Sequence, residues 1–290
     1  MGQLEGGPLE AGFGAAEEGR LKAERVLDQA VDSARRGFGP RFLAAFAIGS
    51  LAHGGFSALA SDVDLAVLLD DPLDPDDGAR LELSTATARR IPFGDRLSVF
   101  WGSPETLRTG IGGRFPAHDL LDLAAHGRLL AGRDVRGGMR RPGSEELLVA
   151  GAEFILTTLA PPGSPTEKRL ADPASVLSEG PRVASKLALF PVRFLYTAQT
   201  GRLGLTEPAV VHYLATHGAD DPRAALVLAA ARWRFEWDAT DDAAGCLLGQ
   251  ARALYSEVVA DHIPRLRSVG RYDLAAGLVS WRAVLAGQPV

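Results

Sequence analysis

The stretch "AFAIGSLAHGGFSALASDVDLAVLLDD", residues 45–71, places Asp62 and Asp64 at the start of an otherwise apolar run. Side chains of a β-strand alternate between its two faces, so residues two apart point the same way. The two aspartates therefore share one face, while every second residue from Val63 to Leu69 is apolar and can pack in a core. Two carboxylates this close repel unless one keeps its proton or a cation binds between them. Because Mg²⁺ typically takes one or two protein carboxylates together with water and substrate phosphates, the pair predicts a Mg²⁺ site.

A Gly-Ser pair lies upstream of the aspartates. Gly49 and Ser50 end an apolar strand predicted over residues 42–48, and the pattern that follows predicts a tight turn and a short helix. Small residues at such a turn let backbone N–H groups and the Ser50 hydroxyl approach a phosphate closely. The turn and the acidic strand together predict a site that holds the phosphates of a nucleotide against metal.

Composition agrees with an intracellular enzyme but does not select one. With 290 residues, of which 46% are hydrophobic, the chain can bury a large core in one or two domains. A net charge of −5 argues against strong nonspecific nucleic-acid binding. The lone cysteine, Cys246, excludes an intrachain disulfide and fits a reducing compartment. Since no signal-like segment or membrane-spanning apolar run is visible, we expect a cytoplasmic protein that is not bound to a membrane.

Glycine and proline residues mark the expected boundaries between the parts of the chain. Residues 1–15 are expected to form a flexible leader, 16–160 a first domain, 161–180 a Pro-, Ser- and Gly-rich linker, and 181–290 a helical bundle. In the first domain the patterns predict helices over 17–36, 77–90 and 119–130 and strands over 42–48, 62–69 and 96–101. In the second they predict helices over 181–199, 207–216, 222–237, 241–262 and 271–286. The predicted class is α+β, with a small mixed sheet flanked by helices followed by an all-α bundle.

Three parts of the sequence resemble known nucleotidyltransferases. The order and spacing of Gly49-Ser50 and Asp62-Val63-Asp64 resemble the motif of nucleotidyltransferases related to DNA polymerase β. In addition, "RFLYTAQTGRL", residues 193–203, resembles a segment in the helical domain of the streptomycin/spectinomycin (aminoglycoside) adenylyltransferases, and "DLLDLAAHGRLLAG", residues 119–132, resembles the end of their nucleotidyltransferase domain. The resemblance implies Mg²⁺-dependent transfer of AMP from ATP to a hydroxyl of an aminoglycoside, with release of pyrophosphate, as in antibiotic resistance.

The resemblance also implies roles for individual residues. It assigns Gly49 and Ser50 to the triphosphate, Asp62 and Asp64 to two Mg²⁺ ions, and Arg193 to a phosphate contact from the helical domain. ATP would be a substrate lying between the two domains. Attack on the α-phosphorus would be in line, with two metals stabilising the attacking and leaving oxygens.

The sequence departs from the family at several of its functional positions. A glutamate on the next strand serves the family as third carboxylate and base, but "DRLSVFW" puts Ser98 there, and a serine takes up no proton near neutral pH. Asp95 is nearby, yet it can substitute only if the strand starts late or bulges. A family asparagine corresponds to Lys186, which could itself contact phosphate. A family lysine falls near a threonine, although Arg202 keeps the basic residue directly after the Thr-Gly pair.

These departures leave three interpretations open. The chain is an active nucleotidyltransferase with altered acceptor chemistry, in which metal alone activates the acceptor or Asp95 or a substrate group is the base. Alternatively, it is a catalytically impaired nucleotide-binding protein, a pseudoenzyme or sensor. An antitoxin-like protein is less attractive, because such minimal nucleotidyltransferases usually lack a helical domain. The expected partners are a nucleoside triphosphate and a small-molecule acceptor, and no motif identifies the base, the acceptor or the oligomeric state.

Overall fold

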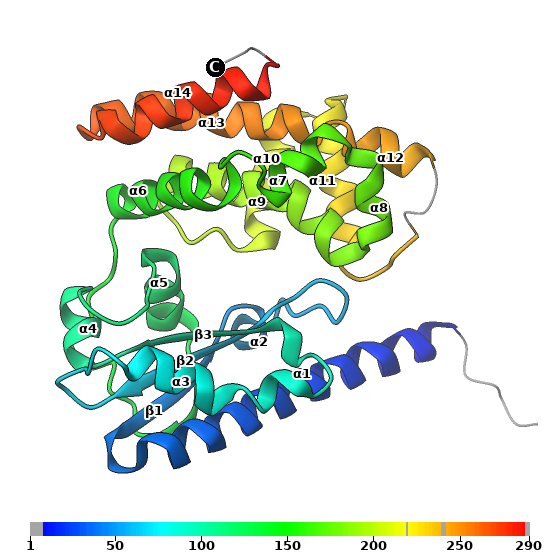
Figure 1. The fold of residues 1–290 in the computed structure, drawn as a ribbon. Coiled ribbons are helices and arrows are strands. Elements are labelled where there is room, and N and C mark those ends of the chain that lie inside the picture. The colour runs from blue at the N-terminus through cyan, green and yellow to red at the C-terminus, as the bar shows by residue number, and fades with distance from the viewer. Residues whose placement is uncertain (1–7, 219, 239–241, 288–290) are drawn as a thin grey trace, which may run out of the picture. The chain divides into compact units, whose positions relative to one another are not determined.

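The computed structural model describes residues 8–218, 220–238 and 242–287, with the side chains of 8–15 and 242 excepted. The chain divides into two compact units, Met1–Arg141 and Pro142–Val290 (Figure 1). This division falls before the expected linker at 161–180, which belongs to the second unit. The start of the expected leader lies outside the described residues, and a helix begins within it at Pro8.

The N-terminal unit combines a sheet with helices on both of its faces. Its elements are α1 (Pro8–Phe38), η1 (Gly39–Arg41), β1 (Phe42–Ile48), α2 (Ser50–His53), β2 (Val63–Leu69), α3 (Asp77–Thr85), η2 (Ala88–Arg90), η3 (Gly94–Arg96), β3 (Leu97–Gly102), α4 (Pro104–Thr109), α5 (Ala117–His126) and β4 (Arg128–Gly132). Within the described residues the strands form a four-stranded sheet in the order β3-β2-β1-β4. β1 is antiparallel to β2 and β4, whereas β2 and β3 are parallel. The mixed sheet confirms the predicted α+β class.

The alternation of the strand residues separates two apolar cores. Alternate residues of β2, from Val63 to Leu69, pack with α1 and α3. The intervening Ala66 and Leu68 pack with α4 and α5 on the opposite face. Figure 1 shows α1 and α3 on one side of the sheet and α4 and α5 on the other. Asp64 has the parity of the second set, so its position in β2 faces the side that α5 covers.

The prediction of a helix over 119–130 is wrong at its C-terminal end. α5 ends at His126, and Arg128–Gly132 forms β4 at the edge of the sheet. A short apolar run such as this one can become either helix or strand, and its periodicity does not decide between them. Pairing with β1 decides here, because it gives the backbone of 128–132 hydrogen-bond partners. Arg128 also forms an ion pair with Glu24 on α1, at 2.7 Å.

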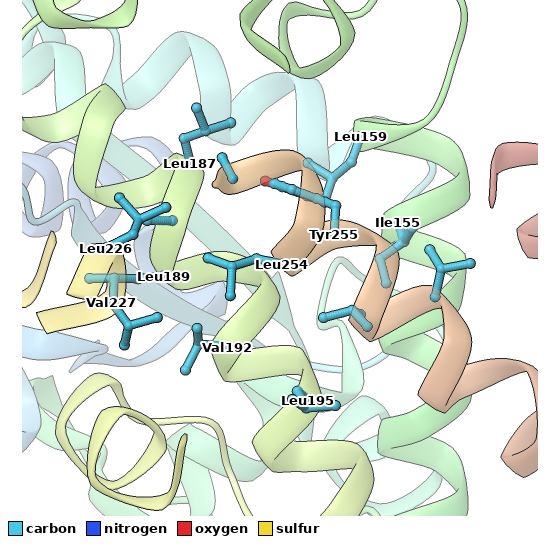
Figure 2. Close-up of a cluster of buried hydrophobic side chains, with 14 of the residues drawn as sticks. Ile155, Leu159, Leu187, Leu189, Val192, Leu195, Leu226, Val227, Leu254 and Tyr255 are labelled. Atoms are coloured by element: carbon cyan, nitrogen blue, oxygen red, sulfur yellow. The ribbon is translucent and has the colours of Figure 1, made fainter. Parts of the chain in front are cut away.

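The regular structure in the described residues of the C-terminal unit is helical. Its elements are α6 (Ser144–Phe154), a π-helical turn η4 (Ile155–Leu159), α7 (Pro165–Ala171), η5 (Pro173–Ser175), α8 (Val176–Glu179), α9 (Pro181–Thr200), α10 (Thr206–His217), α11 (Pro222–Trp233), α12 (Asp242–Leu248), α13 (Ala251–Ser268) and α14 (Tyr272–Leu285). α9 packs against α6, α10, α11 and α13. Apolar side chains from these helices interdigitate around α9, as Figure 2 shows for Leu187, Val192 and Leu254.

Two segments of this unit differ from the predictions, which gave a linker over 161–180 and one helix over 241–262. Residues 161–180 form α7, η5 and α8, with Leu170 and Val176 buried in the core. Two of its prolines explain part of the difference, because Pro165 and Pro173 begin α7 and η5, where their missing N–H has no intrahelical partner. The helix predicted over 241–262 is divided into α12 and α13 by a turn at Gly249-Gln250. Across the described ranges, no helix has the length and apolar character needed to cross a bilayer.

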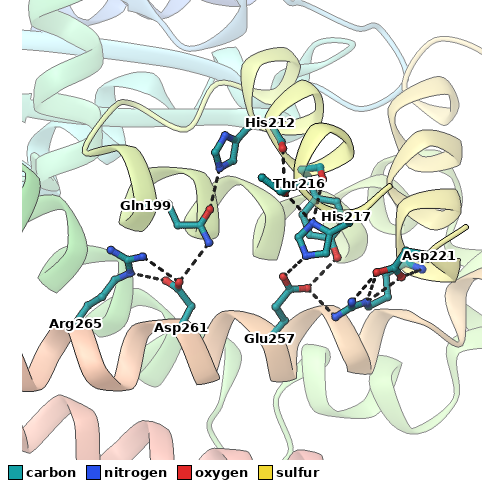
Figure 3. A network of polar contacts seen from close by, with 10 residues as sticks. Gln199, His212, Thr216, His217, Asp221, Glu257, Asp261 and Arg265 are labelled. Carbon is teal, nitrogen blue, oxygen red and sulfur yellow. Dashed lines mark hydrogen bonds and ion pairs between the residues drawn. The ribbon is translucent and has the colours of Figure 1, made fainter. Parts of the chain in front are cut away.

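A polar network joins α10, α11 and α13 (Figure 3). Glu257 on α13 lies 2.6 Å from His217 Nε2, accepts a hydrogen bond from the Tyr213 hydroxyl at 2.9 Å, and pairs with Arg223 at 3.0 Å. Arg223 in turn forms an ion pair with Asp221, which precedes α11 and accepts the backbone N–H of Arg223. The hydrogen bonds from Arg223 lower the pKa of Asp221 to about 2, against the opposing effect of burial. We interpret this network as structural, because its polar groups supply one another's hydrogen-bond and ion-pair partners.

Substituting Asp221 with asparagine is expected to destabilise the protein by about 1–2 kcal/mol at pH 7. The folded-state pKa of this carboxyl lies below its unfolded value, so its stabilisation is complete above about pH 5 and is lost as the pH falls toward 2. Urea unfolding of parent and variant at pH 7 and pH 3 measures the change, and about half of the difference should remain at pH 3. Asp238→Asn, which removes an exposed partner of Arg232, should change stability little. A difference between parent and Asp221→Asn that does not shrink at pH 3 would contradict the assignment.

Candidate functional site

The Gly-Ser turn lies directly against Asp64. Gly49 joins β1 to α2 with φ +66°, a backbone conformation that favours glycine. A Cβ added at Gly49 would lie 2.3 Å from Asp64 Oδ2, so the carboxylate occupies the space that any other residue would need. The antiparallel register explains this approach, since it pairs Ile48, the residue before Gly49, with Asp64. The structure thus brings together Gly49, Ser50 and Asp64.

Asp62 immediately precedes β2 and is half-buried, as is Asp64. The loop that leads to it is held in place from two sides. Ser61 Oγ accepts the backbone N–H of Ser57 at 2.9 Å, and Arg96 donates to the carbonyl oxygen of Ala58 at 2.6 Å. The position of Asp62 is therefore fixed by a well-bonded loop as well as by the strand that follows.

Ser98 lies where the resemblance predicted a third carboxylate or its substitute. The parallel pairing of β2 with β3 places Ser98 next to Asp64. Asp95 lies outside the strand, on the turn η3, and is exposed. β3 starts at Leu97, which pairs with Val63, so Asp95 lies two residues before the strand.

The basic residues predicted to contact phosphate lie in the helical unit. Lys186 and Arg193 are seven residues apart on α9, so they lie on the same side of that helix, two turns apart. The Lys186 ammonium lies 5.8 Å from the centre of the Phe190 ring. Arg193 donates through Nε to the carbonyl oxygen of Gly204, which ties it to the turn that carries Arg202. Arg202 itself is exposed.

Arg234, at the end of α11, joins this basic group, although the sequence patterns did not single it out as a site residue. Burial lowers the pKa of its guanidinium, and the positive charge of Arg193 lowers it further. The two positive charges are therefore close enough to act on one another. Two half-buried arginines whose charges act on one another favour the binding of an anion, and guanidinium groups match the geometry of phosphate.

Asp122 on α5 was also missed. Its Oδ2 accepts the backbone N–H of Gly49 at 2.6 Å, and the residue is only 7% exposed. The available signal was a charged residue between Leu121 and Leu123 in an apolar helix. A buried carboxylate needs partners, and its partner here is the Gly-Ser turn.

The donor chemistry of the site suits Mg²⁺ in part. Asp62, Asp64 and Ser50 offer the hard oxygen atoms that Mg²⁺ prefers. The Ser50 hydroxyl is buried and has no hydrogen-bond partner among the described residues. In the same described ranges, no three or more His, Cys, Asp or Glu side chains are arranged to hold a metal ion. A Mg²⁺ ion bound by the two aspartates would thus need further ligands from water and a substrate, which is its usual mode of binding.

Comparison with known proteins supports the fold. No protein-family model matches the chain, and no curated protein is significantly similar to it in sequence. Among solved structures, the crystal structure of spectinomycin adenyltransferase AAD(9) from Enterococcus faecialis with ATP and spectinomycin is similar, with a TM-score of 0.52. The fold is nucleotidyltransferase-like. The match covers 82% of this chain and 98% of that protein at 12% sequence identity. At this identity it establishes a shared fold, and an argument for activity has to come from the residues of the site.

Proposed function

We propose that this protein is a nucleotidyltransferase that transfers AMP from ATP to a hydroxyl group of a small-molecule acceptor and releases pyrophosphate. The observation that carries the proposal is the contact between the Gly49 backbone and the Asp64 carboxylate, where an added Cβ would lie 2.3 Å from Oδ2. This closeness supports a single site built from the turn suited to phosphates and the strand suited to a cation. The fold shared with an adenylyltransferase whose structure contains ATP supports the same conclusion.

Each of these residues has a separate proposed role. Asp62 and Asp64 would hold Mg²⁺, which supplies neutralisation of the phosphate charge. Gly49 and Ser50 would orient the triphosphate through the turn. In the reaction an acceptor oxygen forms a bond to the α-phosphorus while the bond to the bridging oxygen of pyrophosphate breaks, and the hydroxyl proton leaves to a base or to water. Asp95 is the proposed base.

The basic residues of the helical unit are the proposed triphosphate contacts. Lys186, Arg193 and Arg202 are assigned to this role, and Arg234 is added because of its proximity to Arg193. Positive side chains stabilise the charge that develops on the departing pyrophosphate.

A second candidate function is a catalytically impaired nucleotide-binding protein. The observation in its favour is the register that places Ser98 next to Asp64, because no carboxylate of β3 then supports proton transfer at that position. Both functions require the same nucleotide site. They differ only in whether an acceptor is adenylylated.

The two candidates are separated by incubating the protein with labelled ATP, Mg²⁺ and a panel of acceptors, including aminoglycosides and spectinomycin, and measuring pyrophosphate release and acceptor labelling. Transfer to any acceptor supports the enzyme. Tight MgATP binding without transfer to any of them supports the impaired protein. If the parent protein does not bind MgATP at all, both candidates are wrong.

A further inference from the structure

We propose that Asp122 is a positioning residue, which holds the Gly49-Ser50 turn in the shape that binds nucleotide phosphates. The proposal rests on the proposed function and deepens it, because it adds a carboxylate from α5 to the part of the site that the β1–β2 region builds.

The contact itself is direct and short. Gly49 donates its backbone N–H to Asp122 Oδ2 at 2.6 Å, across 73 positions of sequence. α5 is also held next to α2 by an edge-to-face contact between His53 and His126, whose ring centres are 5.7 Å apart. The helix that carries Asp122 therefore contacts both the start of the turn and the short helix after it.

Packing alone does not explain a carboxylate at this position. α5 contributes Leu120 and Leu123 to the apolar core beneath the sheet, and an apolar residue at 122 would extend that core. Instead Asp122 is 7% exposed, and its second oxygen, Oδ1, is buried without a hydrogen-bond partner among the described residues. A buried, half-satisfied carboxylate is unfavourable for folding, so its presence indicates a function.

That function follows from the groups around Gly49. Its backbone N–H is committed to Asp122, and the Asp64 carboxylate occupies the space where a Cβ would be. The glycine is thus held from both sides, and its positive φ is fixed. With Gly49 held, the adjacent Ser50 hydroxyl, which has no partner among the described residues, has a defined place from which to donate to a phosphate.

Asp122→Ala and Asp122→Asn test the hydrogen bond separately from the charge. Asparagine keeps a carbonyl oxygen that can accept the Gly49 N–H but carries no charge, whereas alanine removes the acceptor. We expect Asp122→Ala to weaken MgATP binding by about 10-fold or more and to speed hydrogen exchange of the Gly49 amide by a similar factor, and Asp122→Asn to stay within about 3-fold of the parent in both.

The matched control is Asp77→Asn. Asp77 is a fully buried aspartate of the same unit, paired with Arg41 at the opposite end of β1. Its substitution should lower thermal stability and leave MgATP affinity unchanged, which separates a local effect on the turn from general destabilisation.

The outcomes distinguish this proposal from the proposed function. If Asp122→Ala leaves Gly49 exchange and MgATP affinity unchanged while the parent binds MgATP, the positioning role is overturned and the nucleotide site stands. If Asp122→Asn is as impaired as Asp122→Ala, charge is what matters and the positioning role is again overturned. If the parent does not bind MgATP, the proposed function fails, and with it any role of Asp122 toward nucleotide.

Discussion

Replacing Asp62 and Asp64 together with asparagine is expected to reduce nucleotide transfer by a factor on the order of 10²–10³ and to abolish Mg²⁺-dependent binding of ATP. The two carboxylates are the proposed ligands of the cation, and an amide oxygen carries no charge to attract it. Asp64 also lies against Gly49, so its substitution removes a negative charge next to the turn that is proposed to orient the triphosphate. Isothermal titration with MgATP and a pyrophosphate-release assay measure the two effects.

A thermal unfolding experiment extends this test to conditions without turnover. A ligand that binds only the folded state raises Tm. Mg²⁺ with ATP should therefore raise the Tm of the parent and leave that of the double variant unchanged. Asp70→Asn is the matched control, because Asp70 is an exposed aspartate just beyond the other end of β2. Tight MgATP binding by the double variant would show that the cation site lies elsewhere.

Gly49→Ala is expected to lower activity by a factor on the order of 10², because a displacement of about 1 Å in a site can have an effect of that size. The added Cβ would lie 2.3 Å from Asp64 Oδ2, so the carboxylate must move. Alanine at φ +66° is also strained, which should cost about 1–2 kcal/mol of stability. Steady-state kinetics and urea unfolding measure the two consequences separately.

Gly54→Ala supplies the matched control for that experiment. Gly54 also has a positive φ, +90°, but a Cβ added there meets nothing within 4 Å. The control should therefore lose a comparable amount of stability through backbone strain and keep its activity. Equal activity losses in Gly49→Ala and Gly54→Ala would mean that strain in this loop, and not contact with Asp64, limits the reaction.

The sequence was most informative where local pattern determines structure. The alternation around Asp64 predicted β2 and the residues on each of its two faces, because successive side chains of a strand point to opposite sides. Gly49 was recognised because few residue types suit a tight turn before a helix. The helices from α9 onward followed from apolar periodicity, apart from the turn at Gly249-Gln250, whereas α7 and α8 lie where a linker was predicted.

Features that depend on distant parts of the chain were not predictable. β4 is a strand because β1 offers it a partner edge, and nothing within 128–132 reveals that edge. The hydrogen bond between Asp122 and Gly49 joins residues that are far apart in sequence, so Asp122 stands out only as a charge in an apolar helix. The proximity of Arg234 to Arg193 depends in the same way on the packing of α11 against α9.

The pairing of Ser98 with Asp64 bears on how such a protein can evolve. Position 98 stays beside Asp64 through backbone hydrogen bonds of β2 and β3, which do not depend on its side chain. A carboxylate can accordingly be lost or regained there by a single substitution, with the architecture intact. Under the proposed function, such a substitution would separate nucleotide transfer from nucleotide binding while the backbone of the sheet stays unchanged.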